Sequence, residues 1–279
     1  GYLHLMRFYQ FSGSHKAVNP GTTLKVMSYN VRNFNSYGWL NIDAQKEITE
    51  LITQENPDVL LMQEYRFRGE PVNFSFPHRY QIFKLKKAGG GLVIFSKFPL
   101  IETGSIRYGI GPDSVDAGRA IYADIEFDNR QIRLINTHLA SVGFQKEEYQ
   151  RLENPNKGDG EEIKRGFLKI ARQLDSAFTK RSHQAKILAQ AVEESPHPTI
   201  VAGDFNDTPN SYAYHLVNKT LKDAYLEAGS GFSKTYAKGP VPLRIDHIFY
   251  HPQLEVFNYK VIAKEFSDHF PVTATFEWQ

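Results

Sequence analysis

The stretch that most constrains this chain is Ile200–Pro209, which reads IVAGDFNDTP. Its first residues are apolar and mostly β-branched, a pattern typical of a buried strand. The strand runs through Gly203 into Asp204 and Asn206, whose side chains are two residues apart and point the same way. Together they could orient a water molecule, a phosphate oxygen or a hard cation. A simple Asx turn is the alternative, because Asp and Asn also favour turns through local hydrogen bonds.

The composition narrows the class of protein. The chain has 279 residues, of which 41% are hydrophobic and 23% charged, and these values suit a globular protein with a large core. A net charge of +2 is too small to indicate a polyanion-binding protein. The chain has no cysteine, which excludes disulfides, thiolate metal sites and a cysteine nucleophile. No run of residues is long and apolar enough to predict a membrane span.

The first residues differ in composition from the rest. The chain begins at Gly1 without a methionine, Tyr2–Phe11 is rich in aromatic and apolar residues, and Ser12–Thr23 is polar. Residues 1–22 could be the tail of a longer N-terminal region that holds a membrane tether. They could equally be a vector remnant followed by a native arm packed on the domain. From residue 23 to residue 279 we expect a single domain, and we expect a monomer.

Strand and helix patterns alternate after residue 23. Apolar runs predict strands at Leu24–Tyr29, Val59–Met62, Tyr80–Leu85, Leu92–Ser96, Ile101–Tyr108, Ile121–Phe127, Ile132–Thr137, Thr199–Ala202, Leu243–Tyr250 and Val272–Phe276. Amphipathic patterns predict helices at Asp43–Gln54, Glu161–Thr179, Ser182–Glu194 and Ser211–Val217. Gly89–Gly91 indicates a tight turn and no phosphate loop, because no Gly-Lys-Ser/Thr follows it. The segment from Val142 to Ser182 could form a specificity wall or be a plain insertion.

Reactive polar residues lie at or near the ends of most of these strands. They are Asn30, Glu64, His138, Asp204 with Asn206, and Asp268 with His269 at the entry to the last strand, while Asp246 lies within a further strand. Each has an ordinary structural explanation: a turn asparagine, a surface glutamate, a packing histidine or a salt-bridge aspartate. A reactive polar residue at the end of nearly every strand is far less common by chance. In α/β sheets, functional sites gather at strand ends.

These residue types have a common chemistry. Carboxylates and amides are the ligands of Mg²⁺ or Mn²⁺, and such an ion polarises a phosphoryl oxygen and neutralises developing charge. A histidine held by an aspartate is kept oriented as a donor or base. The set is suited to cutting a phosphate ester with water. A serine hydrolase and a zinc protease are disfavoured, because neither G-x-S-x-G nor H-E-x-x-H occurs.

Six motifs in order give the chain a family resemblance. They are LKVMSYNVRNF (24–34), PDVLLMQE (57–64), INTHLAS (135–141), IVAGDFNDTP (200–209), RIDHIFY (244–250) and SDHFPV (267–272). The series resembles that of the endonuclease/exonuclease/phosphatase superfamily, whose fold is the deoxyribonuclease I-like fold. The resemblance runs from about Leu24 to the C-terminus. It implies an α/β (α+β) fold, a four-layer α/β/β/α sandwich with two central mixed sheets and the site at one rim.

The resemblance also implies metal-binding roles. Glu64 would be the principal metal ligand, and Asn30 would help it. Asp268 would sit beside the metal or support the neighbouring histidine. His138 matches the second histidine of deoxyribonuclease I, the sphingomyelinases and the inositol polyphosphate phosphatases.

Catalytic roles follow from the same resemblance. Asp204 would position or deprotonate the attacking water, and Asn206 would hold that water or a phosphate oxygen. His269 would contact the scissile phosphate, and Asp246 would orient it.

Some positions depart from part of the superfamily. Exonuclease III-like repair enzymes carry an aspartate where this chain has Arg32 and a tyrosine near the position of His138, which disfavours abasic-site repair. Arg119, in the segment Ala117–Tyr122, is a candidate phosphate contact or a surface arginine. Tyr236 could stack on a base or line the site, although an aromatic residue in a strand is more often core.

Three functions remain open on the sequence. The first is a Mg²⁺-dependent phosphoesterase, in particular a phosphodiesterase or nuclease. The second keeps this chemistry but acts on a lipid or inositol phosphate at a membrane, with Tyr2–Phe11 as the only hint. The third is a non-catalytic binding module that kept the fold, which the complete set of polar residues disfavours.

Overall fold

Two six-stranded sheets pack face to face in the computed structural model, which describes residues 6–19, 21–36, 38–66, 74–83, 90–109, 119–143, 148, 160–238 and 242–279. The first sheet has the order β13 (Leu254–Val261), β14 (Val272–Trp278), β2 (Leu24–Asn30), β3 (Val59–Tyr65), β5 (Gly91–Ser96), β4 (His78–Ile82). The second has the order β10 (Lys222–Asp223), β12 (Asp246–Tyr250), β9 (Thr199–Asp204), β8 (Arg130–His138), β7 (Arg119–Phe127), β6 (Leu100–Arg107). Each sheet has one parallel pair, β2 with β3 and β8 with β9, among antiparallel neighbours.

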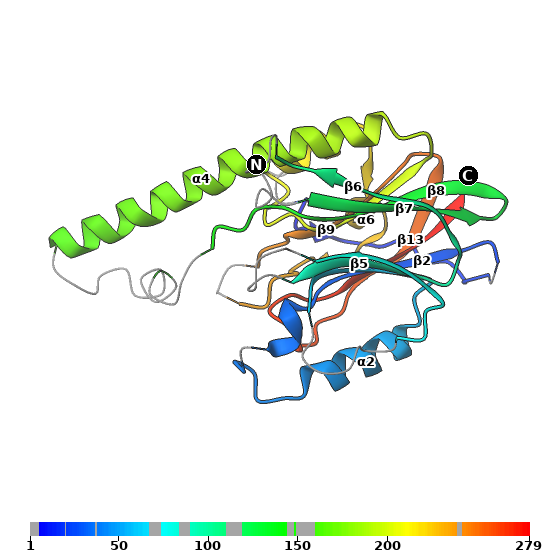
Figure 1. The fold of residues 1–279 in the computed structure, drawn as a ribbon, viewed down its shortest axis with the longest axis horizontal. Helices are drawn as coiled ribbons and strands as arrows, with labels where there is room; N and C mark the ends of the chain where they lie inside the picture. Colours follow the sequence, from blue (N-terminus) through cyan, green and yellow to red (C-terminus); the bar gives the residue numbers. More distant parts are fainter. Residues whose placement is uncertain are drawn as a thin grey trace.

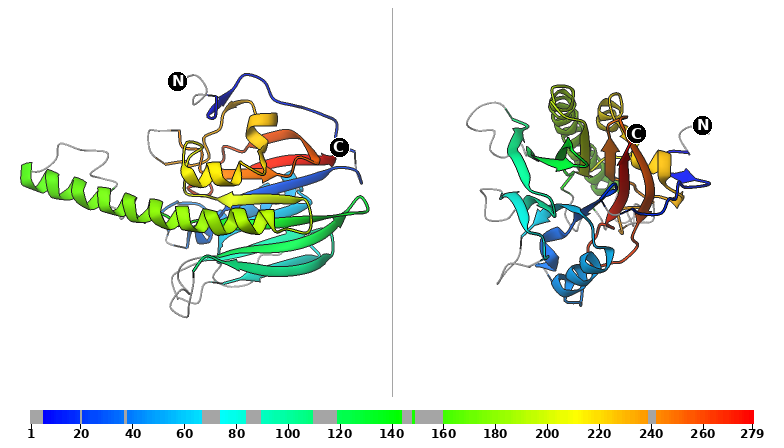
Figure 2. Two further views of the ribbon diagram at one scale, coloured as in Figure 1. Left: turned by 90° about the horizontal axis from the view of Figure 1, so that it is seen from above. Right: turned by 90° about the vertical axis from the view of Figure 1, so that its right-hand side faces the viewer.

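Helices cover the outer face of each sheet (Figure 1). Helix α2 (Ala44–Glu55) buries Ile48 and Leu51 against the first sheet. The C-terminal half of α4 (Gly160–Glu193) covers the second sheet through Ala185 and Leu188, and the short α5 (Tyr212–Val217) covers it through Ala213 and Val217. The end-on view in Figure 2 shows the same layers. The expected four-layer α/β/β/α sandwich with two central mixed sheets is therefore confirmed.

Strands buried on both faces explain why the sequence shows apolar runs instead of alternation. In β2, Leu24 and Val26 face the core between the sheets, whereas Met27 and Tyr29 face the layer of α2. One polar link crosses the core: Gln63 Nε2 donates to Asn136 Oδ1 at 2.8 Å. Asn136 Nδ2 in turn donates to backbone oxygens of the first sheet at 2.8 and 2.9 Å. Because a buried amide tolerates few alternative geometries, this link fixes how the sheets align.

Two expectations about the elements are wrong. The helices expected at Glu161–Thr179 and Ser182–Glu194 are one continuous helix, α4. Arg181, at the expected break, is buried, and its Nε donates to Asp207 Oδ2 at 2.9 Å. Strand β13 was not expected. Most of the loop expected at Glu147–Gly160, part of the Gly89–Gly91 turn and the end of Tyr80–Leu85 lie outside the described residues.

The described part of the N-terminal arm lies on the domain. Strand β1 (Tyr9–Gln10) pairs with β11 (Gly231–Phe232). Arg7 Nη1 donates to Pro209 O at 2.8 Å, and Lys16 Nζ lies 2.6 Å from carboxylate oxygens of both Glu255 and Glu277. The short helix α6 (Ala224–Ala228) lies beside β12 and β13. Among the described residues, no helix combines the length and apolar character needed to cross a bilayer.

Candidate active site

The polar strand ends meet at one rim of the sandwich because of the sheet topology. Parallel strands β2 and β3 bring Asn30 and Glu64 to the same edge of the first sheet. Parallel strands β8 and β9 bring His138 opposite Asp204 in the second sheet. Strand β12 runs antiparallel to β9, so its first residue, Asp246, pairs with the last residue of β9. The segment before β14 enters the first sheet at this rim and carries His269.

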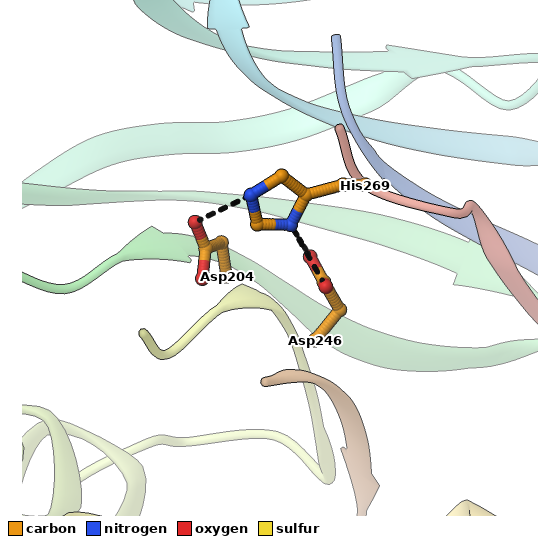
Figure 3. A group of neighbouring side chains, drawn as sticks. All are labelled: Asp204, Asp246 and His269. Atoms are coloured by element: carbon orange, nitrogen blue, oxygen red, sulfur yellow. Dashed lines mark hydrogen bonds and ion pairs between the residues drawn. The ribbon is translucent and has the colours of Figure 1, made fainter. Parts of the chain in front are cut away.

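A buried aspartate–histidine–aspartate group lies at the centre of the rim (Figure 3). His269 Nδ1 lies 2.9 and 3.1 Å from the two carboxylate oxygens of Asp246. Asp246 can only accept when it is ionised, so Nδ1 carries the proton. On the other side of the ring, His269 Nε2 lies 3.7 Å from Asp204 Oδ2. The imidazole is thus held between two carboxylates.

Electrostatics favour a charged histidine here. Burial alone would lower the pKa of His269, but attraction to Asp246 and Asp204 outweighs it and holds the pKa well above its usual value. Burial raises the pKa of the Asp204 carboxyl, and the positive charge of His269 opposes that rise. A carboxylate with a raised pKa beside an imidazolium is a competent proton acceptor for a water molecule.

Asn30 and His138 connect this group to Glu64. Asn30 Nδ2 donates to Asp204 Oδ2 at 3.0 Å and to Glu64 Oε1 at 3.3 Å. His138 Nε2 lies 3.4 Å from Asp204 Oδ2 and 4.0 Å from Glu64 Oε1. Glu64 and His269, predicted to converge from opposite ends of the chain, therefore share one cluster through Asp204.

The loop after β9 makes the Asx turn that local chemistry favours. The backbone N–H of Asn206 donates to Asp204 Oδ1 at 2.7 Å, and its side-chain Nδ2 donates to Asp204 Oδ2 and to Leu139 O, each at 3.1 Å. The two interpretations of this stretch are thus compatible, because the turn itself orients the Asp204 carboxylate. Gly203 precedes it at φ +150°, and a Cβ there would lie 1.9 Å from Thr137 O in the adjacent parallel strand. Only glycine fits that close approach.

Glu64 has an unusual backbone conformation. Its φ is +51°, at a register shift between Met62 and Tyr65 in the β3–β5 pairing. A left-handed non-glycine residue costs about 1–2 kcal/mol. Gly90 packs against it so closely that a Cβ there would lie 2.4 Å from the Glu64 carbonyl carbon. Bulges and strained residues of this kind are typical of functional sites, where they aim a side chain.

The other predicted residues lie at the same rim with different partners. Asp268 accepts a hydrogen bond from Arg32 Nη1, and Ser267 Oγ lies 3.3 Å from its Oδ1. Tyr236 contacts His269 edge-on, with ring centroids 5.3 Å apart. Continuing the β7–β8 register beyond the Ile121–Asn136 pair places Arg119 opposite His138. No described contact joins Arg119 to the aspartate–histidine group.

Asn33 is a candidate site residue that sequence reasoning missed. Its Nδ2 donates to Glu64 Oε2 at 3.5 Å, and its Oδ1 is buried without a hydrogen-bond partner. Residues Arg32–Asn35 have φ values between 41° and 56°, so four consecutive residues turn left-handed directly after β2. Two asparagines within the run RNFN are the only sequence signal, because Asn tolerates this conformation better than most residues.

The donor set fits a hard divalent cation. Glu64 and Asp204 offer carboxylates, and the unpartnered Oδ1 of Asn33 is a neutral oxygen of the kind that completes such a site. A second set of possible ligands is formed by Asp204, Asp246 and His269. Each offers one ligand atom, and the three atoms lie within 4.8 Å of one another. No thiolate is present, which favours oxygen-preferring ions over soft ones.

Comparison with known proteins identifies the family of the chain. The sequence profile of the Endonuclease/Exonuclease/phosphatase family matches residues 27–269. The chain belongs to this family. Its members are hydrolases that act on phosphate esters and generally use a divalent metal.

Two solved structures share the fold. One is an endonuclease/exonuclease/phosphatase from Bacteroides vulgatus, 21% identical, with a TM-score of 0.66 over 92% of this chain and 100% of that chain. The other is the human nocturnin catalytic domain with a bound sulfate, also 21% identical, with a TM-score of 0.63 over 94% and 97%.

A curated relative is similar in sequence. It is the inositol phosphosphingolipids phospholipase C of Schizosaccharomyces pombe, 26% identical over 227 residues, or 75% of this chain and 48% of the relative. The chain thus spans about half the length of that relative.

Proposed function

We propose that this chain is a Mg²⁺-dependent phosphodiesterase, with Mn²⁺ as a substitute ion, whose catalytic domain comprises residues 23–279. One observation supports it most: Glu64 from the first sheet and His269 from before β14 both reach Asp204, through Asn30 and through the imidazole itself. An acid, a base and a candidate cation site are thus within reach of one phosphate. Diester preference is part of the proposal.

Glu64 and Asn30 would hold the ion, and Asn33 would add a neutral oxygen. When bound, the ion would polarise a phosphoryl oxygen and neutralise the charge that develops on it. Asp268 fits the supporting role better than the ligand role, because Arg32 and Ser267 already engage its carboxylate.

Two residues would handle the protons and charge of water attack. Asp204 would accept the proton of the attacking water, with Asn206 keeping its carboxylate oriented. His269, charged through Asp246, would donate a hydrogen bond from Nε2 to a phosphate oxygen. Asp246 would hold the imidazolium in this orientation throughout, so that its Nε2–H faces the phosphate.

Three further residues would complete the substrate site. His138 would hold a phosphate oxygen on the side opposite His269. Arg119, at the same edge as His138, would meet the next negative charge of the substrate. Tyr236, packed on the His269 ring, would line the entrance.

The test is turnover by purified protein with Mg²⁺ on a bis-aryl phosphodiester, single-stranded DNA and double-stranded DNA. Glu64→Ala and His269→Ala should each lose about 10²–10⁴-fold in kcat, the usual contribution of a positioned acid or base. Exposed Glu50→Ala and His183→Ala serve as matched controls. Absence of metal-dependent turnover on all three substrates would contradict the function, and wild-type rates in both site variants would contradict the site. Size-exclusion chromatography tests the expected monomer.

A lipid or inositol phosphate ester at a membrane is the second candidate. It is favoured by the relative named as an inositol phosphosphingolipids phospholipase C. Turnover of vesicle-borne phosphosphingolipid without turnover of DNA would support it, and a steep fall of affinity with salt on duplex DNA would favour a nuclease. A non-catalytic binding module is the remote alternative, for which calorimetry should detect no Mg²⁺ binding.

A further inference from the structure

Helix α4 extends well beyond the sheets that its C-terminal half covers (Figures 1 and 2). Arg181 anchors the helix to the body of the domain, and N-terminal to it Ala177 and Ile170 are also buried. Arg181 Nη1 donates to Ala140 O at 2.8 Å, and its Nε donates to Asp207. At 1.5 Å per residue, the part from Gly160 to Lys180 is about 30 Å long. The core of the fold does not need an extension of this length.

A groove of about 600 Å³ runs along this outer half of α4. Its helical wall carries Arg165, Lys169, Arg172 and Lys180, and its other wall includes Ser141 and Val142. These cations are three to eight residues apart, so they line one face of the helix over four turns. Four positive side chains along one wall fit an anionic surface.

The positive charge of the chain is concentrated in this segment. Residues 160–182 contain six basic and three acidic residues, whereas the rest of the chain contains 27 basic and 28 acidic residues. Lys169 is partly neutralised by Glu148, whose Oε1 lies 2.5 Å from its Nζ. Within the part of the chain that the structure describes, no carboxylate forms an ion pair with Arg172 or Lys180. Their charges face solvent and are available to a ligand.

Large apolar side chains are exposed on the same outer half. The exposed fraction is 40% for Phe167, 48% for Leu168 and 48% for Phe178. Contacts to a nucleic-acid backbone need no such groups, because they are made by charge. A helix that lies in a membrane interface needs both kinds, cations for the anionic headgroups and apolar side chains for the acyl boundary. The combination therefore favours a lipid surface over a nucleic-acid duplex.

The groove is close to the candidate active site. Strand β8 ends at His138, and Val142 in the groove wall is four residues later. Four residues span at most about 15 Å. A surface that contacts α4 would thus hold its phosphate headgroups within reach of the rim.

We propose that the outer half of α4 is an interfacial helix that binds an anionic phospholipid membrane. Arg165, Lys169, Arg172 and Lys180 would contact headgroups, while Phe167 and Leu168 would enter the upper acyl region. The helix would hold the rim against a lipid-borne phosphodiester. This narrows the substrate class of the proposed function and rests on it, although membrane binding itself needs no catalysis.

The test is flotation of the full chain with phosphatidylcholine–phosphatidylserine vesicles and with pure phosphatidylcholine vesicles, at low and high salt. We expect binding to the anionic vesicles only, weakened by salt. Each cation near a membrane surface contributes about five-fold in affinity, so Arg165→Gln/Arg172→Gln should bind about thirty-fold more weakly. The matched control, Lys46→Gln/Lys219→Gln, removes two exposed charges elsewhere and should bind like wild type.

A second variant tests the apolar part. Leu168→Ser should also weaken vesicle binding, without reducing its dependence on salt. Equal binding of wild type and Arg165→Gln/Arg172→Gln would overturn the proposal, and so would binding to an oligonucleotide with no binding to anionic vesicles.

Turnover of a soluble bis-aryl phosphodiester separates membrane binding by α4 from catalysis at the candidate active site. Arg165→Gln/Arg172→Gln should turn over this substrate like wild type, which would also show that the variant is folded. If wild type binds vesicles but turns over no diester, the proposed function fails and the interfacial helix stands.

Discussion

A buried histidine behind the candidate site should make the protein less stable in mild acid. His247 is fully buried, and its Nδ1 faces Arg244 Nη1 at 3.2 Å. Arginine can only donate, so Nδ1 must accept, and the protonated Nε2 donates to Asp207 O at 3.0 Å. A second proton would have to enter at Nδ1, against the guanidinium. Burial, reinforced by Arg244, lowers the pKa of His247 to about 3.

The direction of the effect follows from proton binding. In the unfolded chain this histidine titrates near its usual pKa of about 6.5, so between pH 6.5 and pH 3 the unfolded state binds more protons than the folded state. The contribution of His247 to stability therefore falls as the pH falls through this window, and the raised pKa of His269 opposes this loss in part. Between pH 7 and pH 5 the loss is about 2 kcal/mol. For a chain of this length that corresponds to about 3–4 °C in Tm.

Urea unfolding of wild type and His247→Gln at pH 7, 6 and 5, followed by tryptophan fluorescence, isolates this loss. His247→Gln should destabilise the protein at pH 7, and its difference from wild type in free energy of unfolding should shrink by about 2 kcal/mol at pH 5. Phe249→Leu is the matched control, because it perturbs the same core and removes no titratable group. A His247→Gln difference that stays constant from pH 7 to pH 5 would refute the reasoning.

Three further substitutions test other contacts. Gly203→Ala should destabilise by about 3 kcal/mol or more in urea unfolding, because the new Cβ would lie 1.9 Å from Thr137 O; near-wild-type stability would contradict this strand spacing. Asp246→Asn should lower kcat about 10²–10⁴-fold, and an unchanged kcat would exclude its positioning role. Arg244→Met leaves the buried Asp223 carboxylate without its partner at 2.7 Å and should cost about 3–5 kcal/mol in thermal unfolding; no loss would show that the pair contributes little.

Local sequence predicted the strands that carry the candidate site because each is a short apolar run bounded by polar residues. It missed β13 for a physical reason. A register shift between Phe257 and Lys260, with Asn258 at φ +53°, interrupts the period-2 alternation of Leu254–Val261. The pattern that predicts a strand is therefore broken in the middle of this one.

The break expected in α4 illustrates a different limit. Ser182 resembles a helix start, yet no glycine or proline occurs between Phe167 and Ser195, so nothing forces the helix to end. The deciding contact is that of Arg181 with Asp207, which lies in the loop after β9. A buried ion pair between separate elements leaves no local signal in the sequence.

In the candidate site too, the sequence predicted local features but missed contacts between distant elements. Sequence order and residue type predicted which strand ends would gather, because the parallel pairs place those ends at one edge. The partner of Asp268 could not be predicted, because Arg32 is 236 residues away and reaches it from a left-handed turn. The role of Asn33 depends on that same turn.

The candidate site is divided between the two sheets, so it exists only while they pack in this alignment. Glu64 and His269 come from the first sheet, whereas Asp204 and Asp246 come from the second. The Gln63–Asn136 link lies one residue from Glu64 and two from the end of β8. A slip of one sheet along the other would thus break this buried amide pair and move Glu64 away from Asp204.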